Sequence, residues 1–559
     1  MKLILHAVLI FLILVGLACQ PAGDSYDILI FNGRIIDGTG NPWFKGDVGI
    51  RGEKVVAVGM LRGATARRTI DAEGKVVSPG FIDMLGQSEL TLFVDNRAMS
   101  KISQGITTEV TGEGESAAPI NERTLAELKP FMDKYGVKVD WKDFDGYFRR
   151  LEQHKMAVNL ATFVGATQVR EYVIGFENRE PTQQELEQMK ELVRQAMQQG
   201  ALGLSTSLVY APAVYAKTRE LIELAKVAAE YGGIYASHIR DEGDKEMQAI
   251  LEAGDIGREA KIPVQIWHLK VSGKRNWGTM PEIIKQINIL RKSGIDMTAD
   301  LYPYVAGATG LGATMPGWAL EGGSAKLLER LKDPMTRGNI RAQLESDKFD
   351  RQNFYRDSGP EGILISNIYS PNLKQYEGKR LSEIANEQKK HPIDALFDLL
   401  VADSARTGAI FFMMNEEDVK IALAQPWTSF NTDYNGVATD GPLSTGKPHP
   451  RAYGAFPRIL GKYVREENLL PLEEAIRKMT SLAANRVGLK ERGILKPGFY
   501  ADVVIFDPAK VIDKATFENP HQYSEGIEVV IVNGQPVWEN GTFTGNLPGK
   551  VLRGPGYRR

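Results

Sequence analysis

The central part of the chain alternates short apolar runs with segments in which apolar residues recur every three or four positions. Two phrases between Ile234 and Lys270 show the pattern clearly, because each is a short apolar run that ends on a histidine, His238 or His268. The segment between them carries apolar residues at helical spacing: Met247, Ile250, Leu251, Ile256 and Ala260. Strand, helix and strand within about 30 residues form one βαβ step. Both histidines are therefore expected at the same end of neighbouring parallel strands.

The same alternation extends over residues 77–489 and predicts an α/β fold. Eight strand-like runs end near Met84, Gly112, Gly165, Ser207, His238, His268, Tyr304 and Asp440. Eight such strands with helices between them predict a distorted (β/α)8 TIM barrel. The widest interval separates the last two runs, and its residues 312–350 have a helical, charged pattern. An insertion of this kind at the mouth of a barrel predicts a lid.

The two ends of the chain have a different pattern. Residues 26–76 and 490–545 contain short strands separated by turn glycines, such as Asp27 to Gly33 and Ile527 to Gly534. This spacing is typical of β-hairpins rather than of βαβ units. We therefore expect one small β-sandwich, built from both ends of the chain and attached to the barrel. Residues 549–559 are expected to form a solvated end.

Composition and charge narrow the classes of function. Hydrophobic residues make up 43% of the 559 residues and charged residues 25%, which is ordinary for a globular protein. The formal net charge of −2 gives no electrostatic reason to expect nucleic acid as a partner. The charge gives no reason to expect binding to an anionic membrane surface either.

The first residues have the pattern of an export signal. A short charged head, Met1-Lys2, precedes the apolar run from Leu3 to Leu17, which is short for a membrane span. The only cysteine, Cys19, follows this run. We predict a signal peptide of the lipoprotein type over residues 1–19, with lipidated Cys19 attaching the protein to a membrane. The protein would then be a periplasmic or outer-membrane-anchored lipoprotein or, without lipidation, a secreted protein.

Candidate chemistry lies at the carboxyl ends of the predicted strands, where barrel enzymes carry their active sites. The second strand is followed by Glu113 and Glu115, the fifth and sixth end on His238 and His268, and the eighth ends on Asp440. Two imidazoles and one or two carboxylates form a suitable set of Zn²⁺ ligands with an open position for water. Zn²⁺ lowers the pKa of bound water towards about 7. Asp440 could take the proton of that water and return it to a leaving amine.

Each of these residues also has a purely structural interpretation. A histidine at a strand end can form a backbone hydrogen bond, and an aspartate before a glycine, such as Asp440, is a common turn former. Lys270 and Arg451 are cations placed where they could bind a substrate carboxylate or form internal salt bridges. A serine hydrolase is disfavoured, because Gly203 to Pro212 lacks the Gly-x-Ser-x-Gly turn.

Several motifs occur together between about Asp27 and Glu539. They are Ser78 to Asp83, Gly105 to Thr108, Gly200 to Thr206, Tyr210 to Pro212, Ala236 to Glu242, His268 to Lys270, Tyr302 to Ala306, Asp440-Gly441, His449 to Arg451 and Gly498 to Asp502. Together they resemble the amidohydrolase superfamily, in particular its N-acyl-D-amino-acid deacylase (D-aminoacylase) branch. The resemblance implies a barrel with a split β-sandwich, and hydrolysis of an N-acyl amide. It also implies zinc ligation by His238 and His268, acid and base catalysis by Asp440, and four residues around the substrate carboxylate: Lys270, Tyr210, Tyr302 and Arg451.

The chain departs from the pattern of that family in its metal ligands. Where the superfamily has His-x-His after Asp83, this chain has Leu85 and Gln87, so the first metal position is expected to be empty. The cysteine ligand of the branch is replaced by Glu113 or Glu115, and we favour Glu113. A carboxylate in place of a thiolate makes the site harder and could admit metals other than zinc. We therefore predict a single divalent ion, Zn²⁺, bound by Glu113, His238 and His268.

Three functions are compatible with such a site. The first is a metal-dependent amidohydrolase that cleaves an N-acyl-D-amino acid or a similar small amide through a metal-bound hydroxide. The second keeps the fold but cleaves another bond, as a dipeptidase or a cyclic-amide or lactone hydrolase. The third, motivated by the missing His-x-His, is a catalytically inactive binding protein derived from a hydrolase. We favour the first, because the two histidines, the late aspartate and the cations are all present.

Overall fold

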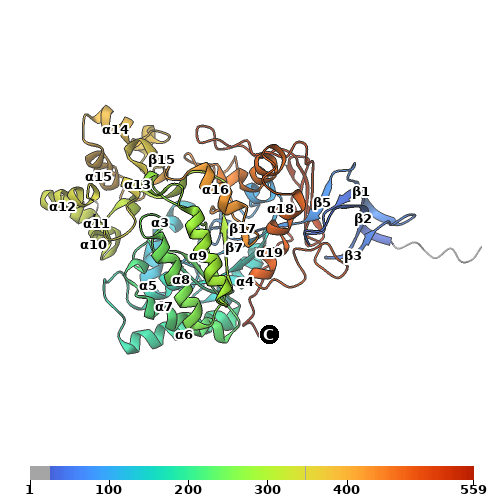
Figure 1. The fold of residues 1–559 in the computed structure, drawn as a ribbon, viewed down its shortest axis with the longest axis horizontal. Helices are drawn as coiled ribbons and strands as arrows, with labels where there is room; N and C mark the ends of the chain where they lie inside the picture. The colour runs from blue at the N-terminus through green and yellow to red at the C-terminus, as the bar shows by residue number, and fades with distance from the viewer. Residues whose placement is uncertain (1–24, 347, 559) are drawn as a thin grey trace, which may run out of the picture.

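The computed structural model describes residues 25–346 and 348–558, and the predicted barrel lies at its centre (Figure 1). Neighbouring barrel strands are parallel from β6 to β8 and from β9 to β17. A hydrogen bond of 3.2 Å from Met84 N to Phe430 O connects the last strand to the first. The predicted fold class is thereby confirmed. Two short strands, β8 and β9, together form one strand of the barrel. The barrel strands are β6 (Phe81–Asp83), β7 (Ile106–Thr111), β8 (Asn159–Thr162), β9 (Val164–Gly165), β10 (Gly203–Ser207), β11 (Ile234–His238), β12 (Val264–Ile266), β13 (Met297–Leu301) and β17 (Thr428–Phe430).

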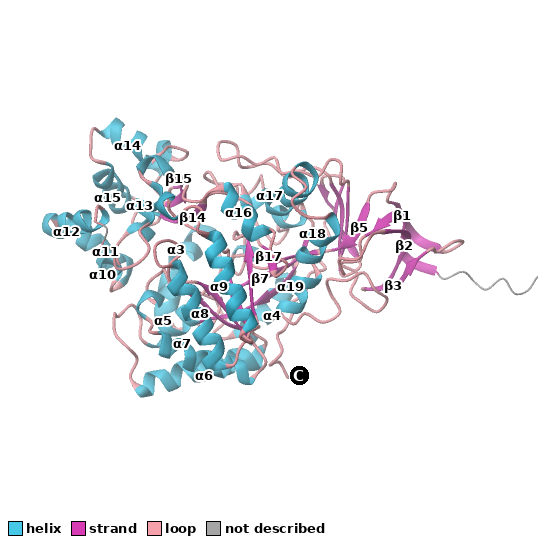
Figure 2. Ribbon diagram, in the orientation of Figure 1, coloured by secondary structure: helices cyan, strands magenta, loops and turns pink. Residues whose placement is uncertain are grey.

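Helices cover the outside of the barrel, as Figure 2 shows for α5 to α9 around the central strands. Helix α6 illustrates how the sequence sets their ends. It begins at a capping box between Thr182 and Glu185 and stops at Gly200, which adopts the left-handed conformation. The helices are α2 (Met99–Ile102), α3 (Glu122–Tyr135), α4 (Phe144–His154), α5 (Ala166–Val173), α6 (Gln183–Gln199), α7 (Thr218–Glu230), α8 (Glu246–Ala260), α9 (Met280–Lys292), α16 (Glu416–Leu423), α17 (Arg451–Arg458), α18 (Leu472–Met479) and α19 (Ser481–Arg486).

The eighth barrel strand lies earlier in the chain than the sequence predicts. It is β17, which pairs with β13, whereas Val437 to Asp440 belong to the loop that follows. The prediction was wrong because the apolar residues Val437 and Ala438 resemble the end of a strand, while β17 itself has only three residues. The carboxylate nearest the end of this strand is consequently Asp433.

The two ends of the chain meet in one nine-stranded sheet beside the barrel. Strand β18 from the late segment pairs antiparallel with β5 from the early one. Their side chains share a core of their own, in which Ile30 and Val48 meet Val503 and Ile531. The sheet lies at the opposite end of the molecule from helices α10 to α15 (Figure 1). Its strands are β1 (Ser25–Ile35), β2 (Phe44–Arg51), β3 (Lys54–Gly59), β4 (Thr65–Asp71), β5 (Val76–Pro79), β18 (Val503–Phe506), β19 (Ile527–Val532), β20 (Gln535–Glu539) and β21 (Thr542–Phe543).

Residues 549–558 do not form the solvated end that we expected. Leu160 N in β8 donates a hydrogen bond to Lys550 O at 2.9 Å, and Leu552 N donates to Leu160 O at 2.7 Å. Gly554 N donates to Gly200 O at 2.8 Å. This late segment therefore supplies backbone partners to the barrel.

A long insertion between β13 and β17 forms the other end of the molecule (Figure 1). Helices α10 to α12 occupy most of the segment 312–350, and the insertion continues with further helices and a three-stranded antiparallel sheet in the order β14-β16-β15. The sheet brings Gly307 to Thr309 and Phe411 to the mouth of the barrel. The elements are β14 (Gly307–Gly310), α10 (Gly317–Leu320), α11 (Gly323–Lys332), α12 (Pro334–Leu344), α13 (Phe354–Ser358), β15 (Ile363–Asn367), α14 (Leu381–Gln388), α15 (Pro392–Ala402) and β16 (Gly408–Phe411).

Within residues 25–346 and 348–558, no helix combines the length and the apolar character that crossing a membrane requires. The predicted signal peptide and Cys19 lie outside the described residues.

Candidate metal centre

Three side chains of the types that bind metals converge at the carboxyl ends of β7, β11 and β12. His238 is the last residue of β11, His268 follows β12, and Glu113 follows β7. Glu113 Oε1 lies 3.1 Å from His238 Nδ1 and 3.0 Å from His268 Nε2. One such atom from each residue lies within 4.8 Å of the others. The structure therefore brings together the three residues that the sequence singled out as ligands.

The backbone around these residues turns sharply, and its conformation is held by specific partners. Gly112 and Gly114 flank Glu113 with φ of +94° and +70°, values that glycine adopts without steric cost. His268 has φ of +36°, and its N–H donates to Asp300 Oδ1 at 2.8 Å. A left-handed backbone at a residue other than glycine persists only where its surroundings hold it. Asp300 provides that support to His268.

Glu115, the alternative ligand in the sequence, does not join this group. Among the described residues, the convergent metal-ligand set consists of Glu113, His238 and His268. Glu115 lines the same cavity at a different point.

A buried ion pair lies behind His268. Lys270 Nζ is 2.6 Å from Glu242 Oε1 and 2.6 Å from His268 Nδ1, and Glu242 Oε1 is 3.0 Å from the same ring nitrogen. Partners on Nδ1 fix the ring so that Nε2 faces Glu113. Hydrogen bonding to the distal nitrogen is the usual way in which a protein orients a metal-binding histidine.

The charges of the centre shift the pKa values of its groups. Burial alone would raise the pKa of Glu113, but its hydrogen bonds with His238 and His268 outweigh burial and hold the pKa below its ordinary value. Burial and the nearby Lys270 would lower the pKa of His268, but the carboxylates of Glu242 and Glu113 raise it to about 10. The centre thus favours positive charge, which a bound cation can supply in place of the proton.

The carboxylate that faces this centre is Asp433, whereas the sequence had pointed to Asp440. Asp440 lies on the loop beyond β17, its side chain is 68% exposed, and it forms an ion pair of 3.0 Å with Arg97. It does not line the cavity, whereas Asp433 does and is buried. Burial raises the pKa of Asp433 above its ordinary value, and Arg451, 2.8 Å away, opposes that rise. Of the two aspartates, Asp433 is therefore the one that the structure places beside the metal centre.

A buried lysine holds Asp433 in an unusual conformation. The φ of Asp433 is +44°. On either side of it, Thr432 Oγ1 and Tyr434 O accept hydrogen bonds of 2.7 and 2.6 Å from Lys101 Nζ, which is fully buried. The same ammonium lies 2.7 Å from Asp83 Oδ2, at the end of β6. Lys101 therefore ties the first barrel strand to the loop that carries Asp433.

Gln87 and Leu85, which replace the His-x-His of the family pattern, have different surroundings. Gln87 Nε2 lies 3.0 Å from Glu113 Oε2 and 3.0 Å from Asp433 Oδ1. Ionised carboxylates only accept hydrogen bonds, so the –NH₂ group must face them. Leu85 is fully buried in an apolar cluster and offers no ligand atom.

A cavity of about 300 Å³ opens beside the centre. The four residues predicted to contact the substrate all line it: Lys270, Tyr210, Tyr302 and Arg451. The guanidinium carbon of Arg451 lies 4.4 Å from the centre of the Tyr302 ring, which favours a cation–π interaction. Tyr210 donates a hydrogen bond of 3.0 Å to Thr309 Oγ1, which belongs to the insertion.

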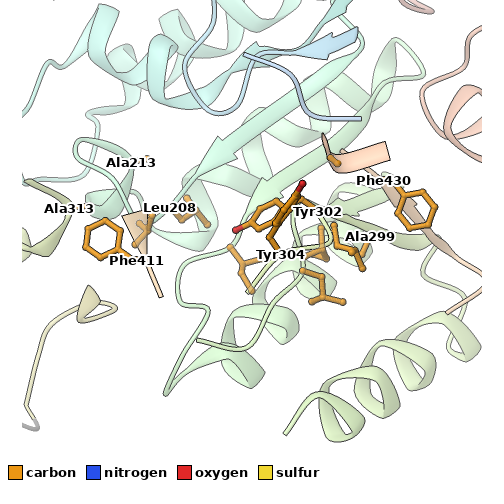
Figure 3. Close-up of a cluster of buried hydrophobic side chains, with 14 of the residues drawn as sticks. Leu208, Ala213, Ala299, Tyr302, Tyr304, Ala313, Phe411 and Phe430 are labelled. Carbon is orange, nitrogen blue, oxygen red and sulfur yellow. The ribbon is translucent and has the colours of Figure 1, made fainter. Parts of the chain in front are cut away.

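The insertion supplies the apolar part of the cavity wall. Ala308, Phe354, Phe411 and Met413 line it. Figure 3 shows part of the underlying core, with Tyr302 and Tyr304 drawn between Phe411 of the insertion and Phe430 of β17. The cavity is therefore polar where it meets the barrel strands and apolar where it meets the insertion.

The geometry fits a divalent cation. Four ligands arranged tetrahedrally at zinc–nitrogen and zinc–oxygen distances of about 2.0–2.1 Å are separated from one another by about 3.3 Å. The separations of 3.0 and 3.1 Å between Glu113 Oε1 and the two imidazole nitrogens are close to that value. Glu113, His238 and His268 can therefore share one ion, with room for a further ligand on the cavity side.

Fold and centre together define a (β/α)8-barrel enzyme with a metal site at the carboxyl ends of its strands. A family model described as "Amidohydrolase family" matches residues 68–274 and 428–538. The chain belongs to this family.

Individual relatives agree with that assignment. A D-aminoacylase from Alcaligenes xylosoxydans xylosoxydans is 37% identical over 95% of this chain and 99% of its own length. A solved D-aminoacylase structure is 38% identical with a TM-score of 0.79, and the match covers 94% of this chain and all of the other. That D-aminoacylase is described as having a binuclear metal centre, with one-metal activation and second-metal attenuation. An N-acyl-D-glutamate deacylase from Bordetella bronchiseptica, solved with zinc and a phosphonate inhibitor, is 33% identical with the same TM-score and covers 95% and 100%.

Proposed function

We propose that this protein is a metal-dependent amidohydrolase that releases the amino acid from an N-acyl-D-amino acid. The observation that carries this proposal is the convergence of Glu113, His238 and His268 beside Asp433, in a cavity that two cations also line. The names of the relatives, D-aminoacylase and N-acyl-D-glutamate deacylase, support the same reaction class. We further propose that the resident metal is a single Zn²⁺ held by these three residues. A bound Zn²⁺ would supply Lewis acidity, which lowers the pKa of water and polarises a carbonyl.

Asp433 is the residue of this chain that we assign to proton transfer. Its carboxylate is buried in the cavity wall, and its pKa is raised by burial, which brings the group closer to the pH at which it must exchange protons. Asp433 takes one proton from the attacking water and delivers it to the amide nitrogen as the C–N bond breaks. Water and amide are thereby converted into a carboxylic acid and a free amino acid.

Lys270 and Arg451 are the residues that we assign to the carboxylate of the substrate. Lys270 has three N–H donors, of which one is directed at Glu242. Arg451 bonds Asp433 through one arm and keeps a planar face on Tyr302. Both cations line the cavity and retain donors for an anion. Tyr302 and Tyr210 have raised pKa values because they are buried, so both stay neutral. Tyr302 can donate a hydrogen bond to the substrate, whereas the hydroxyl of Tyr210 already donates to Thr309 and can accept one.

The cavity wall predicts the class of the substrate side chain. Among the described residues, Lys270 and Arg451 are the lysine and arginine side chains that line the cavity, and the insertion contributes apolar groups. A second substrate carboxylate would find no third lysine or arginine in the cavity wall, which also carries Glu115. Leaving a charge unpaired in such a site costs roughly 2 kcal/mol or more. We expect kcat/KM for N-acetyl-D-methionine to exceed that for N-acetyl-D-glutamate by at least about 10-fold, measured as release of free amine.

A matched pair of variants tests that reasoning. Met413→Leu keeps the wall apolar and is expected to preserve the preference, whereas Met413→Lys adds a cation and is expected to reduce it. Faster hydrolysis of the D-glutamate derivative by the unaltered protein would contradict the prediction.

The proposed function itself is tested by removing and restoring the metal while a panel of substrates is assayed. The panel contains N-acyl-D-amino acids, their L-enantiomers, dipeptides, cyclic amides and lactones. We expect a chelator to abolish hydrolysis of N-acyl-D-amino acids and Zn²⁺ to restore it. Preferred turnover of a dipeptide, cyclic amide or lactone would favour the second function considered from the sequence. Absence of both bound metal and turnover would favour the inactive binding protein. Export and attachment through Cys19 are proposals that rest on residues 1–19 alone.

A further inference from the structure

Each carboxylate oxygen at the metal centre already has a partner, and Gln87 supplies two of these partners. Glu113 Oε1 faces His238 and His268, while Oε2 accepts a hydrogen bond of 3.0 Å from Gln87. Asp433 Oδ1 accepts a second hydrogen bond of 3.0 Å from Gln87, while Oδ2 lies 2.8 Å from Arg451. The two N–H groups of one carboxamide therefore bridge the two carboxylates.

We infer that the Gln87 carboxamide takes the place of a second cation between Glu113 and Asp433, which makes the centre a one-ion site. The inference deepens the proposed function and rests on it for the role of Asp433. A second ion would need the lone pairs of Glu113 Oε2 and Asp433 Oδ1, and the amide nitrogen lies between them. The amide is a neutral donor, so it satisfies both acceptors without adding charge.

The surroundings of Gln87 oppose a second cation in two further ways. Arg451 brings a positive charge within 2.8 Å of Asp433, so a second ion would meet repulsion there. Leu85, on the same turn, is fully buried and has no ligand atom to offer. Glu113 and Asp433 alone would then have to hold the second ion.

The position of Gln87 is set by the backbone. Gly86 N donates to Val110 O at 2.7 Å, and Gln87 N donates to Tyr434 O at 3.2 Å, next to Asp433. A side chain at Gly86 cannot be accommodated, because its Cβ would lie 1.9 Å from Glu109 Oε1. The turn therefore places the amide of Gln87 against Asp433. Gln87 acts as a positioning residue, since it orients that carboxylate.

The test measures metal stoichiometry and does not require turnover. The full-length protein is stripped with a chelator, equilibrated by dialysis against excess Zn²⁺, and analysed for zinc per chain by mass spectrometry. The same measurement is made on Gln87→Glu, which adds a ligand oxygen, and on Gln87→Leu, which removes the amide without adding a ligand. Urea unfolding midpoints show whether each variant is folded.

We expect one zinc per chain in the unaltered protein and in Gln87→Leu, and two in Gln87→Glu. Excess Zn²⁺ is expected to leave kcat of the unaltered protein unchanged and to change kcat of Gln87→Glu. Two zinc ions in the unaltered protein would overturn the inference and leave the proposed hydrolase intact. One zinc in Gln87→Glu would show that Gln87 is not what limits the site. No zinc in any form would overturn the proposed metal centre and this inference with it.

Discussion

Replacing Asp433 with asparagine is expected to lower kcat for an N-acyl-D-amino acid by about 10³-fold while the metal content stays unchanged. The asparagine side chain has the size of the original aspartate and can accept a hydrogen bond from Gln87 or from Arg451, but not from both, and it cannot carry a proton. Loss of a group that acts mainly in the transition state lowers kcat and kcat/KM together. Steady-state kinetics and metal analysis of the purified variant measure both quantities.

Asp440→Asn is the matched control for that experiment. Asp440 was the candidate that the sequence favoured, but its exposed side chain forms an ion pair with Arg97 outside the cavity. Exposed pairs contribute little to stability, so we expect kcat within about two-fold of the unaltered value. A large loss of kcat in Asp440→Asn with full activity in Asp433→Asn would reverse the assignment.

Lys101→Met is expected to destabilise the fold by about 3–5 kcal/mol, because it leaves a buried charge at Asp83 without its partner. Lys101 is fully buried and bonds Asp83, Thr432 and Tyr434. The fraction of Lys101→Met that folds is also expected to have a lower kcat. The left-handed backbone at Asp433 loses the hydrogen bonds that Lys101 donates to the residues on either side of it. Urea unfolding gives the first quantity, and kinetics at low temperature give the second.

Lys129→Met controls for the removal of a lysine as such. Lys129 forms an exposed pair with Asp133 on the same helix, and we expect a change in unfolding free energy below about 0.5 kcal/mol. Equal destabilisation by the two substitutions would contradict the importance of burial at Lys101. Loss of stability in Lys101→Met with unchanged kcat would limit its role to the fold.

The period of the barrel could be predicted from sequence because parallel strands covered on both faces give apolar runs at regular intervals. Most strand ends were found in this way, and with them His238, His268 and Glu113. The prediction failed only at the end of the eighth strand. Strand β17 has three residues, and the apolar residues Val437 and Ala438 of the following loop imitate a strand that ends on Asp440.

The remaining parts of the site depend on contacts that no local pattern carries. Asp433 reaches the centre because it adopts a positive φ that Lys101 supports from a distant helix. The bridge formed by Gln87 depends on the meeting of three loops. Glu242 could have been found, since it lies four residues after His238 in the motif from Ala236 to Glu242. Its partnership with Lys270 became evident only in three dimensions.

The nine-stranded sheet has a consequence for the order in which the protein can fold during synthesis. Strand β5 pairs with β18, so a strand that is synthesised early lacks this hydrogen-bonding partner until the late strand has been synthesised. The backbone of Leu160 in the barrel likewise lacks its hydrogen-bonding partners until Lys550 and Leu552 have been synthesised. Contacts between such distant parts of a chain slow folding because a long loop must close first. The edge of β5 that binds β18 therefore stays open until residues 503–506 have been synthesised, and a holdase chaperone would bind this edge in that interval.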